Sequence, residues 1–321
     1  MSNRWYYIAG IILLLGIGSI VLMTLIIPPQ PDPSPASQTD KLAEILARGR
    51  IVIATDSAYP PNSDLVPGAS RTAGTKCAPT EYTANQVTGY NVAVAEEIAR
   101  QLGVEPCFVM PTRTQIISGS WAEGWDIHVG SLTITSDRMK ALYFTQPYYA
   151  GPVVMFVHKN NSAFSEISDL SGKRVGVCAG CILERYLQGT LELPGQTIDF
   201  AVKNASIVAY DNEANALSDL AAGDGVKLDA VLTNLPMGQD AIKNGIPIRP
   251  LNKPAFYGYV AAAVDKKSSR DPASFVNTVT GIIRQQHSDG TLQKLSQQYY
   301  GQDRSTEAGK FNISALGQFP P

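Results

Sequence analysis

The chain has 321 residues, of which 44% are hydrophobic and 17% charged, and its formal net charge is -2 at neutral pH. This composition is typical of a globular protein large enough for two compact units with separate cores. A near-neutral charge without a run of Lys or Arg argues against a nucleic-acid-binding protein. The three histidines show no metal-ligand spacing, so we expect no metal site and no cofactor.

The N-terminus carries a long apolar run. Residues 8–27 contain no charged side chain, and at about 1.5 Å per residue a helix of this length spans about 30 Å, the thickness of a hydrocarbon core. Arg4 precedes the run and favours an orientation with the N-terminus inside the cell. A secretory signal has a shorter apolar core of about 7–15 residues. We therefore interpret residues 1–27 as an uncleaved transmembrane anchor.

The segment that follows keeps a cleaved signal open as the alternative. Ser34 and Ala36 are small residues at the two positions that a signal peptidase reads. No cysteine lies near the end of the apolar run, which excludes a lipoprotein anchor. Residues 28–39 are rich in proline and predict a semi-rigid linker. Under either interpretation, the rest of the chain is extracytoplasmic.

Strands and helices alternate along the exported part. The predicted elements are helix 40–47, strand 51–55, helix 92–102, strands 107–110 and 127–129, strand 174–177, helix 182–188, strand 207–210, helix 213–222, strand 229–233, a helix from 236, strand 257–264, and helices 272–287 and 291–299. Residues 62–87 show no periodicity and predict a long loop. This alternation predicts an α/β protein with a mostly parallel sheet.

One loop combines several groups that bind anions. A strand near residues 126–130 is followed by two hydroxyl residues, Ser131 and Thr133, and by a short helix start that carries Arg138. Free N–H groups at a helix start, hydroxyl donors and a guanidinium fork together match a carboxylate. From these residues alone, a surface loop with a solvated Arg138 remains an alternative.

The same loop carries a family resemblance. Residues 129–149, VGSLTITSDRMKALYFTQPYY, resemble the S-x-[ST]-I-T-x-x-R…F-[ST]-x-P-Y segment of the bacterial extracellular solute-binding proteins, family 3, which feed polar amino acids to ABC importers. Further blocks follow in the family's order: RIVIATDSAYPP at 50–61, TGYNVAVAEEIARQLGVEPCF at 88–108, DLSGKRVGVCAG at 169–180, and short matches at 257–264, 289–291 and 299–301.

The resemblance implies a bilobal α/β fold, the type II periplasmic-binding-protein fold. Its two α/β lobes are joined by a hinge of two crossings, near residues 147–153 and 254–259. Lobe 1 is expected to contain residues 40–150 and 257–301, lobe 2 residues 151–256, and a C-terminal tail residues 302–321. A ligand then binds between the lobes, at the carboxyl ends of the strands, and the hinge closes around it.

The resemblance also implies a set of ligand contacts. In lobe 1 they are Asp56 and Tyr59 after the first strand, and Gly130, Ser131, Thr133 and Arg138 in the loop described above. The chain departs from the family elsewhere. Arg113 stands where an aromatic residue often stacks on the ligand, although a solvated loop Arg is as good an interpretation. Cys181 and Ile182 replace the usual Ser or Thr, and Asn234 replaces the usual Asp that binds the α-ammonium.

The four cysteines are expected to form two disulfides. Cys178 and Cys181 precede a helix and locally resemble a thioredoxin redox site, but a structural disulfide fits an oxidising compartment better. Cys77 in the long loop and Cys107 on the second strand are then the natural second pair.

The resemblance implies a binding protein without catalytic activity. It would capture an amino acid or a similar small carboxylate and deliver it to the permease of an ABC transporter. The main alternative is an enzyme like cyclohexadienyl (prephenate or arogenate) dehydratase, which needs a carboxylic acid in the cleft of the same fold. Only Asp56 and Glu184 are found as acids in the aligned loops. A membrane-tethered ligand sensor is the third interpretation.

Overall fold

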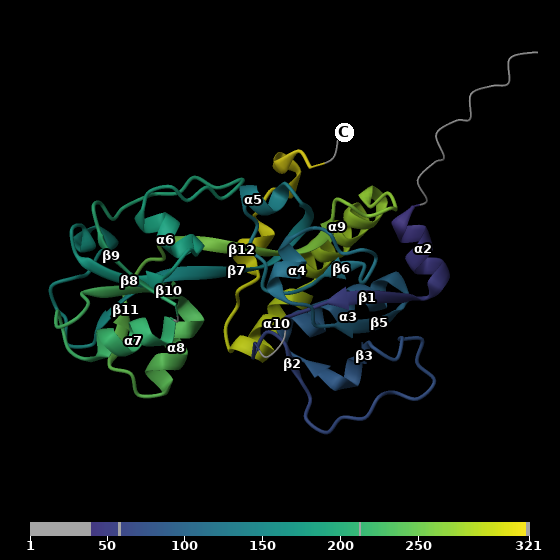
Figure 1. Cartoon of the computed structure of the whole chain (residues 1–321), viewed down its shortest axis with the longest axis horizontal. Coiled ribbons are helices and arrows are strands. Elements are labelled where there is room, and N and C mark those ends of the chain that lie inside the picture. The colour runs from purple at the N-terminus through teal and green to yellow at the C-terminus, as the bar shows by residue number, and fades with distance from the viewer. Residues whose placement is uncertain (1–39, 57–58, 212, 319–321) are drawn as a thin grey trace, which may run out of the picture. The chain divides into compact units, whose positions relative to one another are not determined.

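The computed structural model describes residues 40–56, 59–211 and 213–318 (Figure 1). The expected anchor at residues 1–27 and the linker at 28–39 lie outside these residues. Within the described part of the chain, no helix has the length and apolar character needed to cross a membrane.

The helices and strands follow the predicted order. The helices are α2 Lys41–Arg48, α3 Tyr90–Leu102, α4 Arg113–Ile117, α5 Ser136–Met139, α6 Ile182–Leu187, α7 Glu213–Ala221, α8 Leu235–Lys243, α9 Ala273–Ser288, α10 Thr291–Tyr300 and α11 Thr306–Gly309, with short 3-10 turns at Ala84–Gln86, Ile167–Leu170 and Ile313–Leu316. The strands are β1 Arg50–Ala54, β2 Asp64–Leu65, β3 Tyr82–Thr83, β4 Val87–Thr88, β5 Glu105–Val109, β6 Ile127–His128, β7 Leu142–His158, β8 Arg174–Cys178, β9 Ser206–Tyr210, β10 Ala230–Asn234, β11 Ile248–Pro250 and β12 Phe256–Asp265. The predicted elements are present with small shifts at their ends, whereas α4 and the full length of β7 were not predicted.

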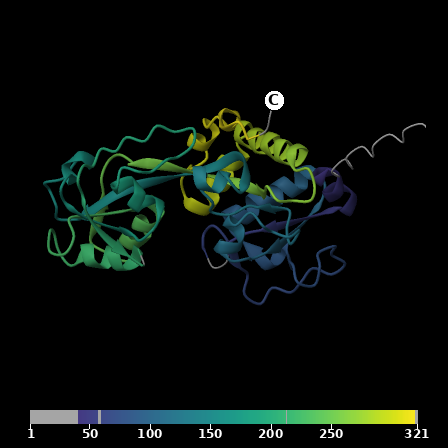
Figure 2. The same cartoon turned by 45° about the horizontal axis from the view of Figure 1, so that its top comes forward.

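The main sheet is mixed, so the prediction of a mostly parallel sheet was wrong at its centre. The strand order is β3-β5-β1-β6-β12-β7-β10-β8-β9, and β11 pairs with β7. Pairs β1–β5 and β1–β6 are parallel, and so are β8–β9 and β8–β10. The central strands β7 and β12 are antiparallel and pair Gly151 with Gly258. They run in opposite directions because the chain enters one half of the sheet through β7 and returns through β12, as Figure 2 shows from a second direction.

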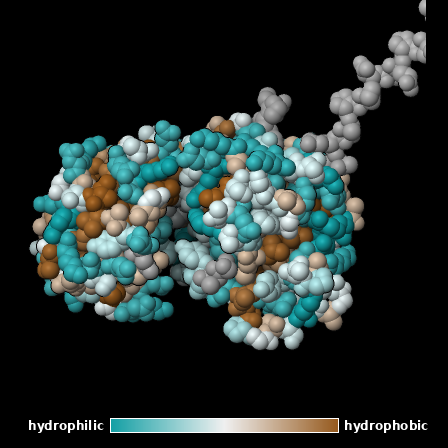
Figure 3. All heavy atoms as spheres, in the orientation of Figure 1, coloured by the Kyte–Doolittle hydropathy of each residue, from teal (hydrophilic) through white to brown (hydrophobic). Residues whose placement is uncertain are grey.

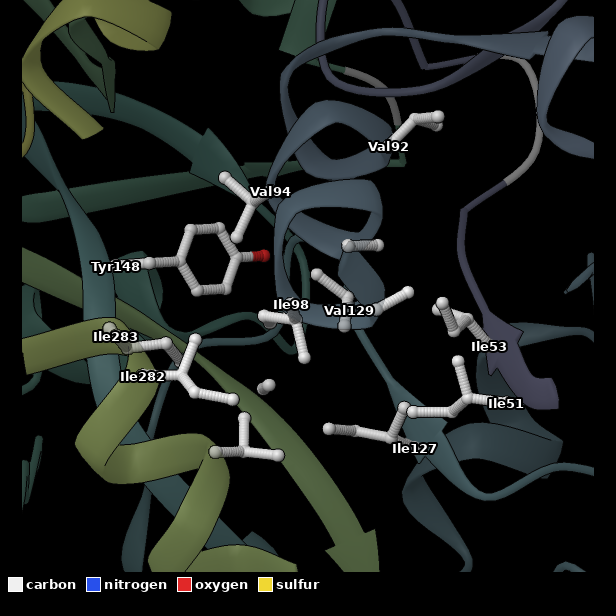
Figure 4. Close-up of a cluster of buried hydrophobic side chains, with 14 of the residues drawn as sticks. Ile51, Ile53, Val92, Val94, Ile98, Ile127, Val129, Tyr148, Ile282 and Ile283 are labelled. Atoms are coloured by element: carbon white, nitrogen blue, oxygen red, sulfur yellow. The ribbon is translucent and has the colours of Figure 1, made fainter. Parts of the chain in front are cut away.

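The core divides at these central strands. We call β1, β3, β5 and β6 with helices α2–α5 and α9–α11 lobe 1, and β8–β11 with helices α6–α8 lobe 2. The lobe 1 core (Figure 4) packs α3 and α9 against β1 and β6 through buried side chains that include Ile51, Ile53, Ile98, Ile127, Val129, Ile282 and Ile283. The lobe 2 core includes Val153, Met155, Val175, Val177 and Leu232. Burial of each such side chain contributes about 1.5–3 kcal/mol, so each lobe has its own source of stability.

The C-terminal segment is part of lobe 1. Beyond residue 301, named only as a tail from the sequence, the chain forms α11 and a 3-10 turn, and it buries Phe311 and Ile313 against the strands. The amide Nε2 of Gln146 donates to the carbonyl oxygens of Ala308 and Phe311 at 3.0 and 2.9 Å. These buried hydrogen bonds fix the segment to the start of β7.

The long loop at residues 62–87 is tied to the sheet. Cys77 and Cys107 form a disulfide, as expected, which joins the loop to β5 with a Cα–Cα distance of 5.4 Å. The loop also contributes β3 to the sheet edge and pairs β2 with β4. On the face of the molecule drawn in Figure 3, apolar residues form small separate patches among hydrophilic ones.

Candidate functional site

A cleft of about 640 Å³ is lined by residues of both lobes. The lining residues are Asp56, Tyr59, Pro111, Thr112, Arg113, Ser131, Thr133 and Arg138 from lobe 1, and Cys178, Gly180, Cys181, Ile182, Leu183, Glu213 and Asn234 from lobe 2. The structure therefore brings together all of the predicted ligand contacts except Gly130. Most of them follow the carboxyl end of a strand, the edge where open α/β sheets bind ligands.

Asp56 and Ser131 are held together where β1 and β6 end. The Asp56 carboxylate accepts a hydrogen bond from the backbone N–H of Ser131 at 2.6 Å. The Ser131 hydroxyl in turn accepts from Nδ2 of Asn91, on α3, at 3.3 Å. The Ser131 hydroxyl also hydrogen-bonds with the Tyr149 side chain, so one oxygen of Asp56 is the group of this pair that remains for a ligand.

Gly130 lies behind this wall rather than in the lining of the cleft. Its carbonyl oxygen accepts from the buried hydroxyl of Tyr148 at 2.8 Å. A Cβ atom at this position would lie 2.3 Å from Nε2 of His128 and 2.9 Å from Oδ2 of Asp56. Only glycine fits here without displacing Asp56, so the structure gives Gly130 a steric role.

Arg138 projects from the short helix α5, whose N-cap Thr135 accepts from the Arg138 backbone N–H at 3.3 Å. Its Nη1 donates to the carbonyl oxygen of Thr133 at 2.6 Å. Among the described residues, no carboxylate lies within ion-pair distance of the Arg138 guanidinium. Burial and the nearby charge of Arg113 lower the pKa of Arg138 to about 10, so the group stays charged at neutral pH and can bind a carboxylate.

Arg113 is the first residue of α4; it is exposed and lines the cleft. Thr112 and Gln115 form a capping box, in which Thr112 N–H donates to Gln115 Oε1 at 2.8 Å and Gln115 N–H donates to Thr112 Oγ1 at 3.3 Å. The T-x-x-Q spacing is a known signature of a helix start and could have revealed α4. The helix holds Arg113 where its charge acts on Arg138 and Tyr59.

The lobe 2 wall begins at a second disulfide. Cys178 and Cys181 are bonded, as expected, and Cys181 is the N-cap residue of α6 without a capping hydrogen bond from its side chain. The carboxylate of Glu184 accepts from the Gly180 backbone N–H at 2.6 Å and is not in the cleft lining. Ile182 presents an apolar side chain, so this wall offers fewer polar groups than the usual Ser or Thr would.

Glu213 is a cleft residue that the sequence analysis missed. It is the first residue of α7, and its carboxylate accepts from the Thr233 hydroxyl at 2.6 Å. It lies next to Asn234, which ends β10 and makes no capping hydrogen bond with its side chain. The inventory of only two acids was therefore wrong. Glu213 comes soon after the carboxyl end of the predicted strand 207–210, and this position could have identified it as a cleft residue.

His128 lies directly behind Asp56 and was not selected from the sequence. It is buried on β6, neither ring nitrogen has a hydrogen-bond partner among the described residues, and Nε2 is 3.9 Å from Asp56 Oδ1. Burial lowers the pKa of His128 to about 4, although the Asp56 charge opposes this effect. The imidazole is therefore neutral at pH 7.

A smaller chamber of about 150 Å³ opens from the cleft toward the central strands. It shares Tyr59, Ser131, Thr133, Ile182 and Asn234 with the cleft, and its remaining lining includes Tyr149, Gly151, Val153, Asp240, Gly258, Val260, Tyr300 and Arg304. The two spaces therefore adjoin, and both are lined by residues of both lobes. The inner end of the chamber lies at the pair Gly151–Gly258 of β7 and β12.

The family model of the bacterial extracellular solute-binding proteins, family 3, matches residues 72–302. The chain belongs to this family. Curated relatives of this family 3 protein include the L-cystine-binding protein TcyJ of Escherichia coli K12, 25% identical over 264 residues that cover 82% of this chain and 86% of the relative. Another is the histidine-binding periplasmic protein of Salmonella typhimurium LT2, 27% identical over 229 residues, 68% of this chain and 81% of the relative.

Solved structures agree with the bilobal fold of this family 3 protein. An ancestral cationic amino acid solute-binding protein is 25% identical with a TM-score of 0.58, covering 81% of this chain and 100% of the other. The L-cystine solute receptor of Neisseria gonorrhoeae, in its unliganded open conformation, is 21% identical with a TM-score of 0.60, covering 83% of this chain and 98% of the other.

Proposed function

We propose that this family 3 protein is the extracytoplasmic ligand-binding subunit of an ABC importer and captures an amino acid in the cleft between its lobes. The observation that carries the proposal is the half-buried guanidinium of Arg138. It faces the cleft beside Ser131 and Thr133 without a carboxylate partner in the described part of the chain. An unpaired, partly desolvated charge of this kind is stabilised by a ligand of opposite charge.

The proposed binding mode follows from the charges of the cleft. The ligand carboxylate would pair with Arg138 and accept from the hydroxyl of Thr133, and its ammonium would lie at the free oxygen of Asp56. Glu213 reaches the ligand from the opposite wall. Because the walls belong to different lobes, binding energy favours the closed arrangement, and β7 and β12 form the hinge.

The relatives support an amino-acid ligand, since the names of curated relatives specify cystine, arginine and histidine. One similar structure, 25% identical with a TM-score of 0.57, is described as an amino-acid-binding precursor of cyclohexadienyl dehydratase. The Asp56 carboxylate accepts a hydrogen bond from Ser131 N–H and the Glu213 carboxylate accepts one from the Thr233 hydroxyl, an environment suited to holding a ligand's positive charge. This favours binding over acid catalysis.

Residues 1–27 are proposed to anchor the protein in the cell membrane, with residues 40–318 on the outer face. The apolar length of residues 8–27 supports an anchor rather than a cleaved signal. Comparing membrane and soluble fractions of cells that express the protein tests this point. Release of a shortened protein in the soluble extracytoplasmic fraction would favour the signal.

The experiment that tests the function is a thermal-shift screen of the purified protein with the common amino acids and small carboxylates, followed by calorimetry. A ligand at a hundredfold excess over its Kd stabilises the folded state by about 2.7 kcal/mol, which raises the Tm measurably. Prephenate is included because it is the substrate expected if the protein is a cyclohexadienyl dehydratase-like enzyme. Turnover of prephenate without a shift from any amino acid would replace the binding function with the enzymatic one.

A further inference from the structure

Arg304 is a second guanidinium at the site without a counter-ion. It follows α10, is half-buried, and its guanidinium carbon lies 3.8 Å from the centroid of the Tyr300 ring. With the Gln302 amide oxygen turned toward it, Nε and Nη2 donate at 3.2 and 2.9 Å. In the part of the chain that the structure describes, no carboxylate lies within ion-pair distance of Arg304.

Other arginines of the chain are satisfied in other ways. Arg48, Arg50 and Arg174 each pair with a carboxylate. Arg249 donates to the backbone carbonyl oxygens of Asn161 and Phe164 at 3.0 and 2.8 Å. Among the described residues Arg249 also has no carboxylate partner, but it lines neither the cleft nor the chamber, whereas Arg138 lines the cleft and Arg304 lines the chamber. Partial burial of an unpaired charge costs free energy that an anion would recover.

The chamber gives an anion access to Arg304. Its 150 Å³ is lined by Arg304 together with Tyr59, Tyr149 and Tyr300, with Asp240 as its acidic lining residue, and it shares lining residues with the main cleft. A space of roughly 10–15 Å³ already admits one water molecule, so the chamber can hold several heavy atoms of a ligand. The end of an elongated ligand could therefore reach it while the other end stays at Arg138.

Arg304 lines the chamber, and it also lines a separate hollow together with Asp303 and Glu307. The charge of Arg304 acts on the hydroxyls of Tyr59 and Tyr149, where it opposes the effect of burial that raises the pKa of both groups. The Tyr59 hydroxyl also feels Glu213, Asp56 and Arg113. Tyr59 lines both the cleft and the chamber.

We propose that Arg304 and the chamber form a second anion subsite, which makes the ligand an amino acid with a distal carboxylate. The inference rests on the proposed function, because it places the first carboxylate at Arg138. The distal carboxylate enters the chamber past Tyr59 and pairs with Arg304, while hydroxyls of the surrounding tyrosines donate to it. The ligand class is an α-amino acid with a second acidic group at the end of a chain of several carbons.

Matched ligand pairs test this subsite. Lysine is 2,6-diaminopimelate without one carboxylate, and norvaline is 2-aminoadipate without its distal carboxylate. Calorimetry on the full-length protein should show at least tenfold tighter binding of the acidic member in one of these pairs. Arg304→Gln should remove that advantage and change the affinity of lysine or norvaline by less than about twofold.

Two further variants separate the subsite from other roles of arginine. Arg284→Gln removes a charge from the exposed face of α9 and should leave the advantage intact. Arg113→Gln tests whether the arginine of the main cleft binds the distal carboxylate instead. If the tighter binding of the acidic ligand is lost in Arg113→Gln but kept in Arg304→Gln, the proposal is overturned. An equal loss for both members of a pair in Arg304→Gln would reduce Arg304 to a structural contact of Tyr300.

The outcome for the wild-type protein separates this inference from the proposed function. Equal affinity for both members of each pair overturns the second subsite and leaves amino-acid binding in place. Failure of every amino acid in the thermal-shift screen and in calorimetry overturns both.

Discussion

The two walls of the cleft differ in how completely their polar groups are fixed before a ligand arrives. On the lobe 1 wall, Asp56 is held by Ser131 N–H, the Gly130 carbonyl by Tyr148, and Arg138 by the Thr133 carbonyl. On the lobe 2 wall, the Cys178–Cys181 disulfide fixes the loop before α6, but the side chains of Cys181 and Asn234 cap no helix, and the Glu213–Thr233 hydrogen bond is the main polar contact.

This difference indicates that the two walls have different roles in ligand binding. A preorganised wall loses little entropy when it binds the common part of a ligand class, here the amino-acid head group. A less constrained wall can vary its side chains and thereby set which members of the class bind. Changes in lobe 1 should therefore affect all ligands, whereas changes in lobe 2 should affect ligands according to their charge.

The largest effect is expected from Arg138→Ala in lobe 1. Loss of one partner of a buried, hydrogen-bonded charge pair costs about 2–5 kcal/mol, or roughly 30-fold to several thousandfold in Kd. Every amino acid that binds should be affected, while circular dichroism and Tm without ligand stay close to wild type. Calorimetry that shows less than about a threefold change would remove Arg138 from the carboxylate site.

His128 tests how far the lobe 1 wall depends on a buried neutral group. Its pKa is lowered to about 4 in the folded protein, from 6.5, so the unfolded chain takes up a proton first as the pH falls. The contribution of the neutral His128 imidazole to the free energy of unfolding is fully present above about pH 6.5. It decreases toward pH 4, by at most about 1.4 kcal/mol per pH unit.

Urea unfolding of the wild type and of His128→Leu at pH 7 and pH 5 measures this effect. Groups that do not interact with His128, such as His287, are the same in both proteins, so their contributions cancel in the comparison. The wild type should lose more stability between the two pH values than the variant. Equal losses would show that His128 is protonated in the folded protein as readily as in the unfolded chain.

Glu213→Gln addresses the lobe 2 wall. It removes the carboxylate that this wall contributes to the cleft, and a charge-assisted hydrogen bond is worth about 1.5–3 kcal/mol against roughly 1 for a neutral one. We expect about tenfold weaker binding of amino acids and little change for their deaminated analogues. Glu192→Gln, an exposed residue of the same lobe, is the matched control. A uniform loss for charged and deaminated ligands would argue against a charge-specific role.

Asn234→Asp is expected to have the smallest effect. It introduces the carboxylate that most family members carry at this position, which should favour an ammonium by less than about tenfold. The nearby Glu213 repels the new charge and limits the gain. A deaminated analogue should bind more weakly to the variant. If neither affinity changes in calorimetry, Asn234 contributes no contact to the ligand.

Much of lobe 1 could be predicted because its signals are local in sequence. The hydroxyls and Arg138 lie within one loop, and Asp56 follows a strand of unmistakable apolar character. The continuous strand β7 was missed because Pro147 and Pro152 interrupt the run, and proline argues against a central strand. In the structure, the Pro147 carbonyl accepts instead from His287 Nε2, at 2.7 Å.

The residues that sequence analysis missed are brought to the site by tertiary structure. Glu213 and Arg304 lie 91 positions apart in the sequence and belong to different lobes. Neither carries a motif, and within residues 40–56, 59–211 and 213–318 neither forms an ion pair, which is why each is available to a ligand. In the sequence His128 stands between Ile127 and Val129 on a short apolar strand, so no motif marks its ring as part of a site. Such features depend on packing, which only the folded chain determines.

The arrangement of the two cores has a consequence for the order in which the chain folds. The lobe 2 core is assembled from residues between Val153 and Phe256, whereas the lobe 1 core joins Ile45 and Ile51 to Ile283 and Leu292. A chain that emerges N-terminus first can complete lobe 2 while lobe 1 still lacks α9 and α10. The apolar faces of β1, β6 and α3 then stay exposed until residues 273–300, near the end of the chain, are available to cover them. The extracytoplasmic chain should therefore be most vulnerable to proteases and aggregation in the interval before α9 docks.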